Sequence, residues 1–292
     1  SIIDKALSNK MSSHKVYNRS GQSFVTFGGN NLLFTSGAAA IRIEEYNGKY
    51  RDAKFKDLKK LVRIHDYYEN IDIIHTITDV TDIPQEILRS KMAAAVFKNT
   101  RKSCWFVASE PKVVEDIFRM GVAIRGSKEN LVKKPFFRIG AASDAVLGFQ
   151  GKEAELLMKC AELGIPTGNE HYPIMGLTAP LSISGALAIT NANYLCAHVI
   201  KTSINSNNPS IYPVMAGSFN MKNGEIITSS PEIWLYYLAG IKLGQYYNIP
   251  TSVLVSTDSK DIDLQMAYEK AMGYLISASA GATNIFGSTC EL

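Results

Sequence analysis

Residues 173–200 read Pro-Ile-Met-Gly-Leu-Thr-Ala-Pro-Leu-Ser-Ile-Ser-Gly-Ala-Leu-Ala-Ile-Thr-Asn-Ala-Asn-Tyr-Leu-Cys-Ala-His-Val-Ile. A short apolar strand ends at Met175, a turn containing Thr178 and Pro180 follows, and the remainder has the pattern of a helix. Spacings of four and three predict one inward-facing stripe of small and apolar residues: Gly185, Ile189, Ala192, Cys196 and Val199. A strand, a tight loop and a small-faced helix form one unit of a parallel α/β fold.

The same strand–helix unit recurs along the chain from residue 71. Apolar runs predict strands at 71–77, 104–109, 136–141, 165–175, 211–217, 250–256 and 282–286. Helical patterns lie between them at 84–99, 111–124, 151–163, 183–203, 231–247 and 263–280. Alternation at this spacing predicts a parallel sheet with helices outside it.

Two architectures fit this alternation. A (β/α)₈ TIM barrel needs eight strands and eight helices, and the chain stops just after the seventh predicted strand. An open doubly wound sheet needs helices on both faces and usually a glycine-rich first turn, which this sequence lacks. The residues alone leave both open.

The first 69 residues have a different pattern. Short alternating runs at 23–27, 31–34 and 40–46 are separated by Gly28-Gly29 and by Asn47-Gly48, a strong hairpin signal. They predict a β-ribbon appendage, followed by a connecting helix over 55–68. We therefore divide the chain into residues 1–69, with the ribbon and helix, and residues 70–292, with the alternating strands and helices. The ribbon is also a possible surface for homo-oligomerisation.

Composition places the chain among globular proteins with a sizeable core. Hydrophobic residues make up 46% and charged residues 20% of the 292 positions. No stretch approaches the roughly 18 uninterrupted apolar residues of a membrane helix, and the N-terminus lacks a secretion signal pattern. Four scattered cysteines without ligand-like spacing indicate a reducing compartment. We expect a cytoplasmic protein without a membrane partner, and with Cys160 and Cys196 buried.

The net charge of +4 hides an asymmetry. Residues 1–138 carry +9 and the remainder −5. A basic half could dock an acidic partner, although solvated helix faces explain it as well. The basic residues are spread out and lack interleaved aromatic side chains, so nucleic-acid binding is not indicated. The five histidines are dispersed and form no metal-ligand pattern.

Several segments resemble the trimethylamine methyltransferase family, in register from about residue 15 to the C-terminus. The first is residues 175–185 with Asn191-Ala192. The others stand in order as Asn70-Ile71-Asp72, Asn220-Met221-Lys222-Asn223-Gly224, Ser230-Pro231-Glu232, Thr257-Asp258-Ser259-Lys260, Gln265 and Tyr268-Glu269-Lys270. The chain departs from the family pattern at Asn208-Pro209-Ser210 and Met266-Ala267, and these changes bear on the substrate more than on the fold.

The resemblance implies a barrel, because members of that family fold so and extend beyond both ends of this chain. It therefore favours an α/β (β/α)₈ TIM barrel truncated after strand seven, with an N-terminal β-ribbon. It also implies a corrinoid-dependent methyltransferase of one-carbon metabolism and methanogenesis. Such enzymes move a methyl group from a methylated amine to the Co(I) of a separate corrinoid protein, so the cobalamin belongs to the partner. Since the sequence contains only the standard residues, it resembles the branch without pyrrolysine, associated with quaternary amines such as glycine betaine.

Active sites of such barrels lie in loops at the carboxyl ends of the strands. The residues at those positions that suit a methylated amine form the predicted substrate-binding set: His75, Glu170, His171, Tyr172, Phe219, Asp258, Gln265 and Tyr268. Aromatic rings and a carboxylate hold such a cation, with Tyr172, Phe219 and Tyr268 as walls and Glu170 or Asp258 as counter-charge. A substrate carboxylate would need a donor from His75, His171 or Lys260.

Other functions remain open. A non-catalytic relative or fragment would bind methylated amines or the corrinoid protein without turnover, and the missing eighth strand favours it. An unrelated phosphate-handling barrel would need a glycine-rich phosphate loop, which this sequence lacks. No catalytic residue and no metal ligand is predicted.

Overall fold

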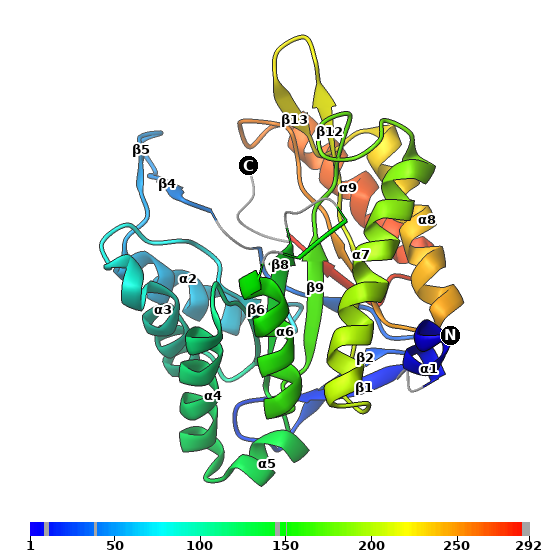
Figure 1. Ribbon diagram of the computed structural model, residues 1–292. Coiled ribbons are helices and arrows are strands. Elements are labelled where there is room, and N and C mark those ends of the chain that lie inside the picture. The colour runs from blue at the N-terminus through cyan, green and yellow to red at the C-terminus, as the bar shows by residue number, and fades with distance from the viewer. Residues whose placement is uncertain (9–11, 38–39, 144–146, 150, 288–292) are drawn as a thin grey trace.

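Eight parallel strands form the centre of the molecule in a computed structural model that describes residues 1–8, 12–37, 40–143, 147–149 and 151–287 (Figure 1). The first four-stranded sheet contains, in order, β6 (Ile73–His75), β7 (Ser103–Val107), β8 (Phe137–Ser143) and β9 (Thr167–His171). The second contains β11 (Tyr212–Val214), β14 (Thr251–Leu254), β15 (Asn284–Phe286) and β3 (Leu33–Phe34). All seven strands predicted from residue 71 onward are confirmed.

The two sheets adjoin at both edges. On one side, the segment just after β3 forms hydrogen bonds with a strand of each sheet. Thr35 N donates to Ile285 O of β15 at 2.9 Å, and Ser36 N donates to Ile73 O of β6 at 3.0 Å. On the other side β9 lies beside β11, so that a Cβ added at Gly168 would lie 3.4 Å from Ile211 O. The strands thus follow one another around a barrel in the order β3, β6, β7, β8, β9, β11, β14 and β15.

The eighth strand corrects the sequence prediction. It is β3, which the sequence analysis placed in an N-terminal ribbon, and it pairs in parallel with β15 through Leu33 and Phe34. The barrel is therefore not cut off after seven strands, and its wall crosses the predicted boundary between residues 69 and 70. Two residues of regular strand leave almost no periodicity to read, which is why the pattern of β3 did not distinguish a barrel strand from a ribbon.

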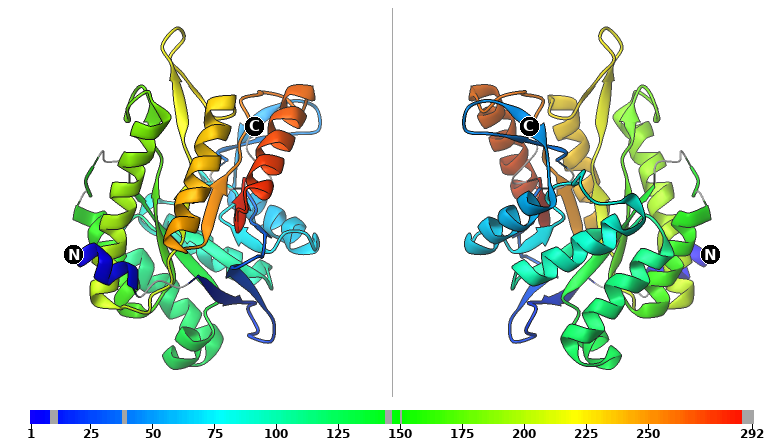
Figure 2. Two further views of the ribbon diagram at one scale, coloured as in Figure 1. Left: turned by 90° about the vertical axis from the view of Figure 1, so that its right-hand side faces the viewer. Right: turned by 90° about the vertical axis from the view of Figure 1, so that its left-hand side faces the viewer.

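Helices surround the strands (Figure 2). The predicted helices are confirmed as α2 (Phe55–Tyr67), α3 (Gln85–Asn99), α4 (Pro111–Arg125), α6 (Gly151–Leu163), α7 (Ile183–Ile204), α8 (Pro231–Tyr247) and α9 (Leu264–Ser279). Their ends follow local chemistry: Ser182 caps α7 by accepting from Gly185 N, and Asp263 caps α9 by accepting from Met266 N. Two short helices, α1 (Ile2–Ser8) and α5 (Lys128–Lys133), were not predicted.

The inner face of α7 differs from the prediction. The predicted stripe is partly exposed, and Cys196 is exposed although Cys160 is buried as expected. The buried face instead includes polar residues, such as His198 and Lys201, because neighbouring segments supply hydrogen-bond partners for them. Lys201 Nζ donates to Thr167 O at 2.9 Å and to Pro209 O at 2.6 Å. Apolar spacing therefore did not indicate which face of α7 is buried.

The same helix passes a membrane-span test by length and composition alone. Within the described ranges, α7 is the one helix that does so, and 39% of its most apolar window is buried inside the protein. It packs between α6 and α8 and against β9. This is the packing of the other helices around the barrel.

The predicted ribbon is divided between two hairpins. β1 (Ser13–Tyr17) and β2 (Phe24–Gly28) pair in antiparallel fashion at the lower end of the barrel in Figure 1. Val16 and Phe27 of this hairpin are fully buried in one cluster with barrel residues such as Trp105. The hairpin therefore closes the amino-terminal end of the barrel with apolar side chains.

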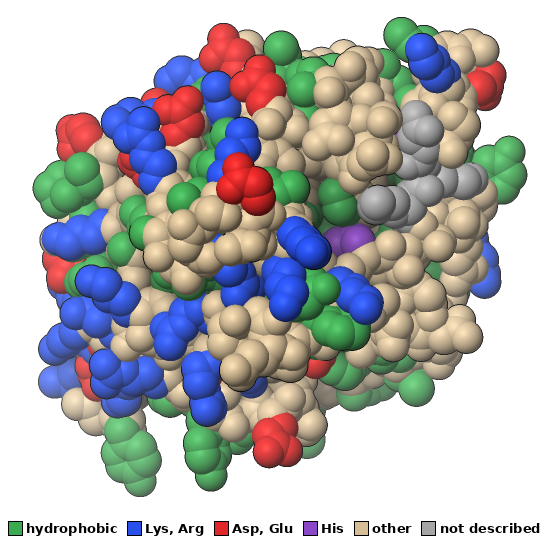
Figure 3. All heavy atoms as spheres, turned by 90° about the horizontal axis from the view of Figure 1, so that it is seen from below, with side chains coloured by type: hydrophobic (Ala, Val, Ile, Leu, Met, Phe, Trp, Pro, Cys, Tyr) green, Lys and Arg blue, Asp and Glu red, His purple; other side chains and the backbone are tan. Residues whose placement is uncertain are grey.

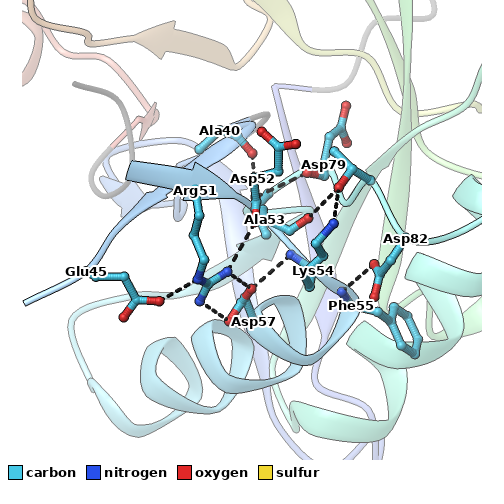
Figure 4. A network of polar contacts seen from close by, with 12 residues as sticks. Ala40, Glu45, Arg51, Asp52, Ala53, Lys54, Phe55, Asp57, Asp79 and Asp82 are labelled. Carbon is cyan, nitrogen blue, oxygen red and sulfur yellow. Dashed lines mark hydrogen bonds and ion pairs between the residues drawn. The ribbon is translucent and has the colours of Figure 1, made fainter. Parts of the chain in front are cut away.

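The second hairpin, β4 (Arg42–Glu44) with β5 (Tyr50–Asp52), turns at Asn47-Gly48 as predicted, with Gly48 at φ +74°. It is fastened to the start of α2 by a polar network (Figure 4). Arg51 donates to both carboxylate oxygens of Asp57, at 2.6 and 3.0 Å, and is also paired with Glu45. These contacts hold the hairpin against the first turn of α2.

A third small sheet lies above the carboxyl ends of the barrel strands in Figure 1. It contains β10 (Ile174–Met175), β12 (Gly217–Asn220) and β13 (Glu225–Ile227). The predicted strand at 165–175 is thus two strands, β9 in the barrel and β10 in this sheet. The hairpin of β12 and β13 was not predicted.

The opposite end of the molecule carries many basic side chains (Figure 3). In the view from below, lysine and arginine side chains gather on the side formed by α3, α4 and α5 (Figure 3). These helices belong to residues 1–138, so the basic half of the sequence contributes the lysine and arginine side chains on this side.

Candidate functional site

Charged side chains lie inside the barrel. Because successive strand residues alternate between the two faces, Trp105, Arg138 and Glu170 point to the interior, while neighbours such as Phe137 and Ile139 pack in the outer layer under the helices. Trp105, Arg138 and Glu170 border a cavity of about 10 Å³, which is close to the smallest volume that holds one water molecule. Further lining comes from Gly168, Asn169, Ile211, Pro213, Met215 and Ser252.

Arg138 is the most unusual of these residues. Its side chain is 2% exposed, and its guanidinium carbon lies 3.4 Å from the centroid of the Trp105 ring and 5.2 Å from that of Phe27. Nε and Nη2 have no hydrogen-bond partner among the described residues. Burial lowers the pKa of Arg138 to about 9, and the charge of Glu170 opposes this. The group therefore stays positive at neutral pH, held by aromatic faces instead of by an ion pair.

Glu170 faces Arg138 from β9. Its carboxylate lies over Gly140, since a Cβ added there would be 2.0 Å from Oε1. That oxygen is buried without a hydrogen-bond partner in the described part of the chain. Burial raises the pKa of Glu170 to about 7, while Arg138 and the Trp105 indole favour the ionised form. At neutral pH this carboxyl is poised between its two states.

His75 completes the aromatic surroundings. Its ring meets Trp105 edge to face at 4.5 Å, and Trp105 meets Phe286 in the same way at 4.8 Å. Burial lowers the pKa of His75 to about 3, so the imidazole is neutral. His75 N donates to Ser36 Oγ at 2.9 Å, which fixes this residue to the chain after β3.

The other half of the interior is polar and satisfied. Thr35 Oγ1 donates to Asn284 Oδ1 at 2.8 Å, and Asn284 Nδ2 donates to Ser252 Oγ at 2.7 Å. This chain of bonds spans β3, β15 and β14. Among the described residues that line the cavity, the unpaired polar atoms belong to β7, β8 and β9, and they include Trp105 Nε1, Arg138 Nε and Glu170 Oε1.

The structure divides the predicted substrate-binding residues. His75 and Glu170 lie in the interior. His171 is 1% exposed and points to the opposite side of β9, because it follows Glu170 in the strand. Tyr172 packs against the interior cluster from the end of β9, and its ring lies 3.3 Å from where a Gly217 Cβ would be. Phe219 lies in β12, above the strand ends.

The remaining predicted residues lie in the loop after β14 and in the first turns of α9. Asp258 accepts from Thr228 N, Thr228 Oγ1 and Ser229 N at 2.8 to 2.9 Å, so it holds the segment before α8. Gln265 donates to Glu269 Oε1 at 2.8 Å, and both belong to α9. Tyr268 is 61% exposed, 6.2 Å from Trp234 between the ring centroids. The structure does not bring these three side chains to the interior.

Sequence reasoning missed Arg138 and Trp105 as site residues. It searched the strand ends, whereas both residues lie within strands β7 and β8. A signal was present, because a single arginine inside the otherwise apolar run 136–141 is rarely buried without a purpose. Across the described ranges no group of three or more His, Cys, Asp or Glu side chains is placed to hold a metal ion.

The fold and this interior define a (β/α)-barrel protein with a small, charged and aromatic site among its strands. Residues 1–290 match the family described as trimethylamine methyltransferase (MTTB), and the chain belongs to that family. The resemblance seen in the sequence is therefore confirmed.

Individual relatives support the assignment at modest identity. The trimethylamine methyltransferase MttB of Desulfitobacterium hafniense (strain DSM 10664 / DCB-2) is 24% identical over 289 residues, which cover 98% of this chain and 58% of that protein. The glycine betaine methyltransferase of Desulfitobacterium hafniense (strain Y51) is 26% identical, covering 96% and 59%. MttB of Methanosarcina barkeri is 28% identical, covering 89% and 54%. The chain thus spans less than two thirds of the length of these relatives.

Solved structures agree on the fold. A dihydropteroate synthase from Coxiella burnetii, in complex with pteroic acid, has a TM-score of 0.57 at 12% identity and covers 96% of this chain and 94% of its own. A dihydropteroate synthase from Xanthomonas albilineans has a TM-score of 0.55 at 12% identity, covering 94% and 92%. At this identity the likeness concerns the barrel alone.

Proposed function

We propose that this chain is the catalytic barrel of a methyltransferase that takes a methyl group from a small quaternary amine, such as glycine betaine. The methyl acceptor would be the Co(I) of a cobalamin carried by a partner corrinoid protein. Membership of the family supports methyl transfer. The observation that carries the substrate assignment is the buried Glu170 carboxylate with its unpaired Oε1 beside the aromatic ring of Trp105.

A methylated ammonium suits these surroundings. It carries its charge without N–H groups, so it needs no hydrogen-bond acceptors and gains from a carboxylate and from aromatic faces. A desolvated cation–π contact contributes about 2 kcal/mol. The neutral His75 provides an aromatic surface in the interior, and Tyr172 packs against the same cluster from the end of β9. A bound cation would also keep Glu170 ionised.

The proposed reaction balances without a general base. One N–CH₃ bond breaks and its electron pair stays on nitrogen, so the amine leaves neutral. The methyl carbon forms its new bond with the electron pair of the cobalt(I) acceptor, which is thereby oxidised to cobalt(III). The chain's own task is to hold the cation and to present one methyl group toward the carboxyl ends of the strands.

The chain's residues fit a corrinoid held by a partner. Each of its five histidines is at most 9% exposed, so none is available at the surface as a ligand for cobalt. The corrinoid partner would approach the carboxyl ends of the strands, where the methyl group is presented, and the cytoplasm would suit a protein with free thiols. We also propose that copies of the chain associate with one another.

The test is methyl transfer from glycine betaine to free cob(I)alamin under anaerobic conditions, in the presence of the full chain. The proposal expects enzyme-dependent loss of the Co(I) absorbance and formation of dimethylglycine. Dimethylglycine as substrate is the matched control, because it is no quaternary amine. If glycine betaine shifts the melting temperature but no methyl transfer occurs, the chain is a binding protein without turnover. If no quaternary amine binds or reacts, the proposed function is wrong.

A further inference from the structure

We propose that Arg138 is the specificity-determining residue of this site and receives the carboxylate of a zwitterionic substrate. The inference rests on the proposed function and deepens it. The family includes relatives named for trimethylamine, which has no carboxylate, and for glycine betaine, which has one. A carboxylate-binding Arg138 would make this chain resemble the relative named for glycine betaine.

The first support is the state of the guanidinium. Arg138 is 2% exposed, and its Nε and Nη2 lack a hydrogen-bond partner within the described residues, although both are fully buried. Leaving a buried charged donor unpaired costs more than leaving a neutral one unpaired. Neighbouring N–H groups of a guanidinium match the two oxygens of a carboxylate. The cavity that Arg138 lines is where such a group would enter.

The second support is that the guanidinium is already positioned. Its Cζ lies 3.4 Å from the centroid of the Trp105 ring and 5.2 Å from that of Phe27 in the closing hairpin. Two aromatic contacts restrict its rotamers before any ligand arrives. Preorganised donors lose little entropy on binding.

The third support is the relative depth of the two charges. In the β7–β8 ladder Arg138 pairs with Trp105, whereas in the β8–β9 ladder Glu170 pairs with Ala142, four residues further along β8. The side chain of Glu170 reaches back along the barrel, so that its carboxylate lies over Gly140, two residues and roughly 7 Å along β8 from Arg138. Glu170 therefore lies nearer the carboxyl end of the barrel. A zwitterion would place its carboxylate down at Arg138 and its methylated nitrogen up at Glu170.

The fourth support is charge balance. Among the described interior residues, Arg138 is the fixed positive charge and Glu170 is the compensating acid, because His14 and His75 are neutral. A simple cation would gain from Glu170 but be repelled by Arg138. A zwitterion gains from both. The cavity of about 10 Å³ has room for about one water molecule, so binding of glycine betaine requires lining side chains to move, among them the flexible side chain of Met215.

The experiment compares two ligands on several variants of the full chain by calorimetry. The ligands are glycine betaine and ethyltrimethylammonium, which has the same ammonium group without the carboxylate. Wild type is expected to prefer glycine betaine by at least about tenfold in Kd, as one charged hydrogen-bonded pair contributes. Arg138→Met should abolish that preference while retaining affinity for ethyltrimethylammonium. Arg138→Lys should restore part of the preference.

Control variants separate the possible failures. Arg119→Met removes an exposed arginine of α4 and should leave both affinities unchanged. Glu170→Gln should weaken both ligands without changing their ratio. If both ligands bind wild type equally well, or if Arg138→Met and Arg138→Lys keep the wild-type ratio, the role of Arg138 is refuted while the proposed function stands. If neither ligand binds wild type, the proposed function itself fails.

Discussion

Thr35 Oγ1 donates a 2.8 Å hydrogen bond to Asn284 Oδ1, and this bond joins residues 249 positions apart in the chain. Both side chains are fully buried in the barrel. The bond fastens the segment after β3 to β15, and therefore the first barrel strand to the last. The barrel depends on a few such contacts, because β3 contains only two residues.

Replacing that hydroxyl should weaken barrel closure. Thr35→Val keeps the shape of the side chain but leaves the buried Asn284 Oδ1 without its donor. We expect a loss of about 1–3 kcal/mol in the free energy of unfolding, measured by urea denaturation. Thr26→Val, in the partly exposed part of β2, is the matched control and should change little. Equal stability of the two variants would show that this bond does not contribute to closure.

A methyl group at Gly140 should disable the site. The new Cβ would lie 2.0 Å from Glu170 Oε1, so the carboxylate must move away from its position over β8. We expect Gly140→Ala to lose at least about tenfold in affinity for quaternary amines, since a displaced charge contributes little. Gly151→Ala, where no atom lies within 4 Å of the added Cβ, is the control. Normal binding by Gly140→Ala would contradict the placement of Glu170.

The pH dependence of binding should follow Glu170. Its pKa of about 7 means that the carboxyl ionises as pH rises through neutrality, and only the ionised form attracts a cation. Nearby Arg138 keeps its charge over this range and His75 remains neutral. Affinity for a quaternary amine should therefore increase between pH 6 and pH 8, measured by calorimetry. In Glu170→Gln this increase should disappear, and its persistence would assign the titration to another group.

The free energy of unfolding should decrease as pH rises, whereas the affinity for a quaternary amine increases. Burial raises the pKa of Glu170 in the folded protein, so the native state holds this proton more tightly than the unfolded chain does. The stabilisation that results from this tighter proton binding is complete below pH 4.5, the ordinary pKa of a glutamate. It is lost as pH rises through about 7, the pKa of Glu170 in the folded protein. The free energy of unfolding of Glu170→Gln, compared with that of wild type, should therefore increase by up to about 3 kcal/mol between pH 5 and pH 8. A constant difference across this range, in urea denaturation, would contradict the raised pKa.

Lys201 is expected to be structural. Its ammonium donates to Thr167 O, Pro209 O and Asn208 Oδ1, which lie around the start of β9 and the loop before β11. Lys201→Met would leave these buried acceptors without a donor, so we expect a loss of about 2 kcal/mol, measured by thermal and urea unfolding. Affinity for quaternary amines should be unchanged, because Lys201 belongs to α7 outside the barrel wall. Lost binding in a folded variant would give Lys201 a further role.

The sequence predicted the regular elements well and the closure of the barrel poorly. Strands and helices from residue 71 onward have strong periodicity and clear ends, such as Gly164, which takes φ +70° just after α6. β3 has neither feature, and its pairing with β15 depends on residues far away in the chain. Such long-range pairing leaves no local pattern, so the eighth strand was assigned to a ribbon.

The site was predicted only in part for a similar reason. Glu170 and His75 were found because they end strands, where barrel sites are expected. Arg138 was missed because it lies inside a strand, where apolar residues are the rule. Asp258 and Gln265 bear functional groups of the right kind, but their partners are Thr228 and Glu269, which no spacing revealed.

The pairing of β3 with β15 also governs the order of events during synthesis. Leu33 and Phe34 leave the ribosome some 250 residues before their partners Asn284 and Ile285. Until then the nascent chain has an open sheet with an unpaired edge, which is prone to aggregation. Translation pauses or chaperone contacts during this interval would influence the yield of folded protein without changing the finished barrel.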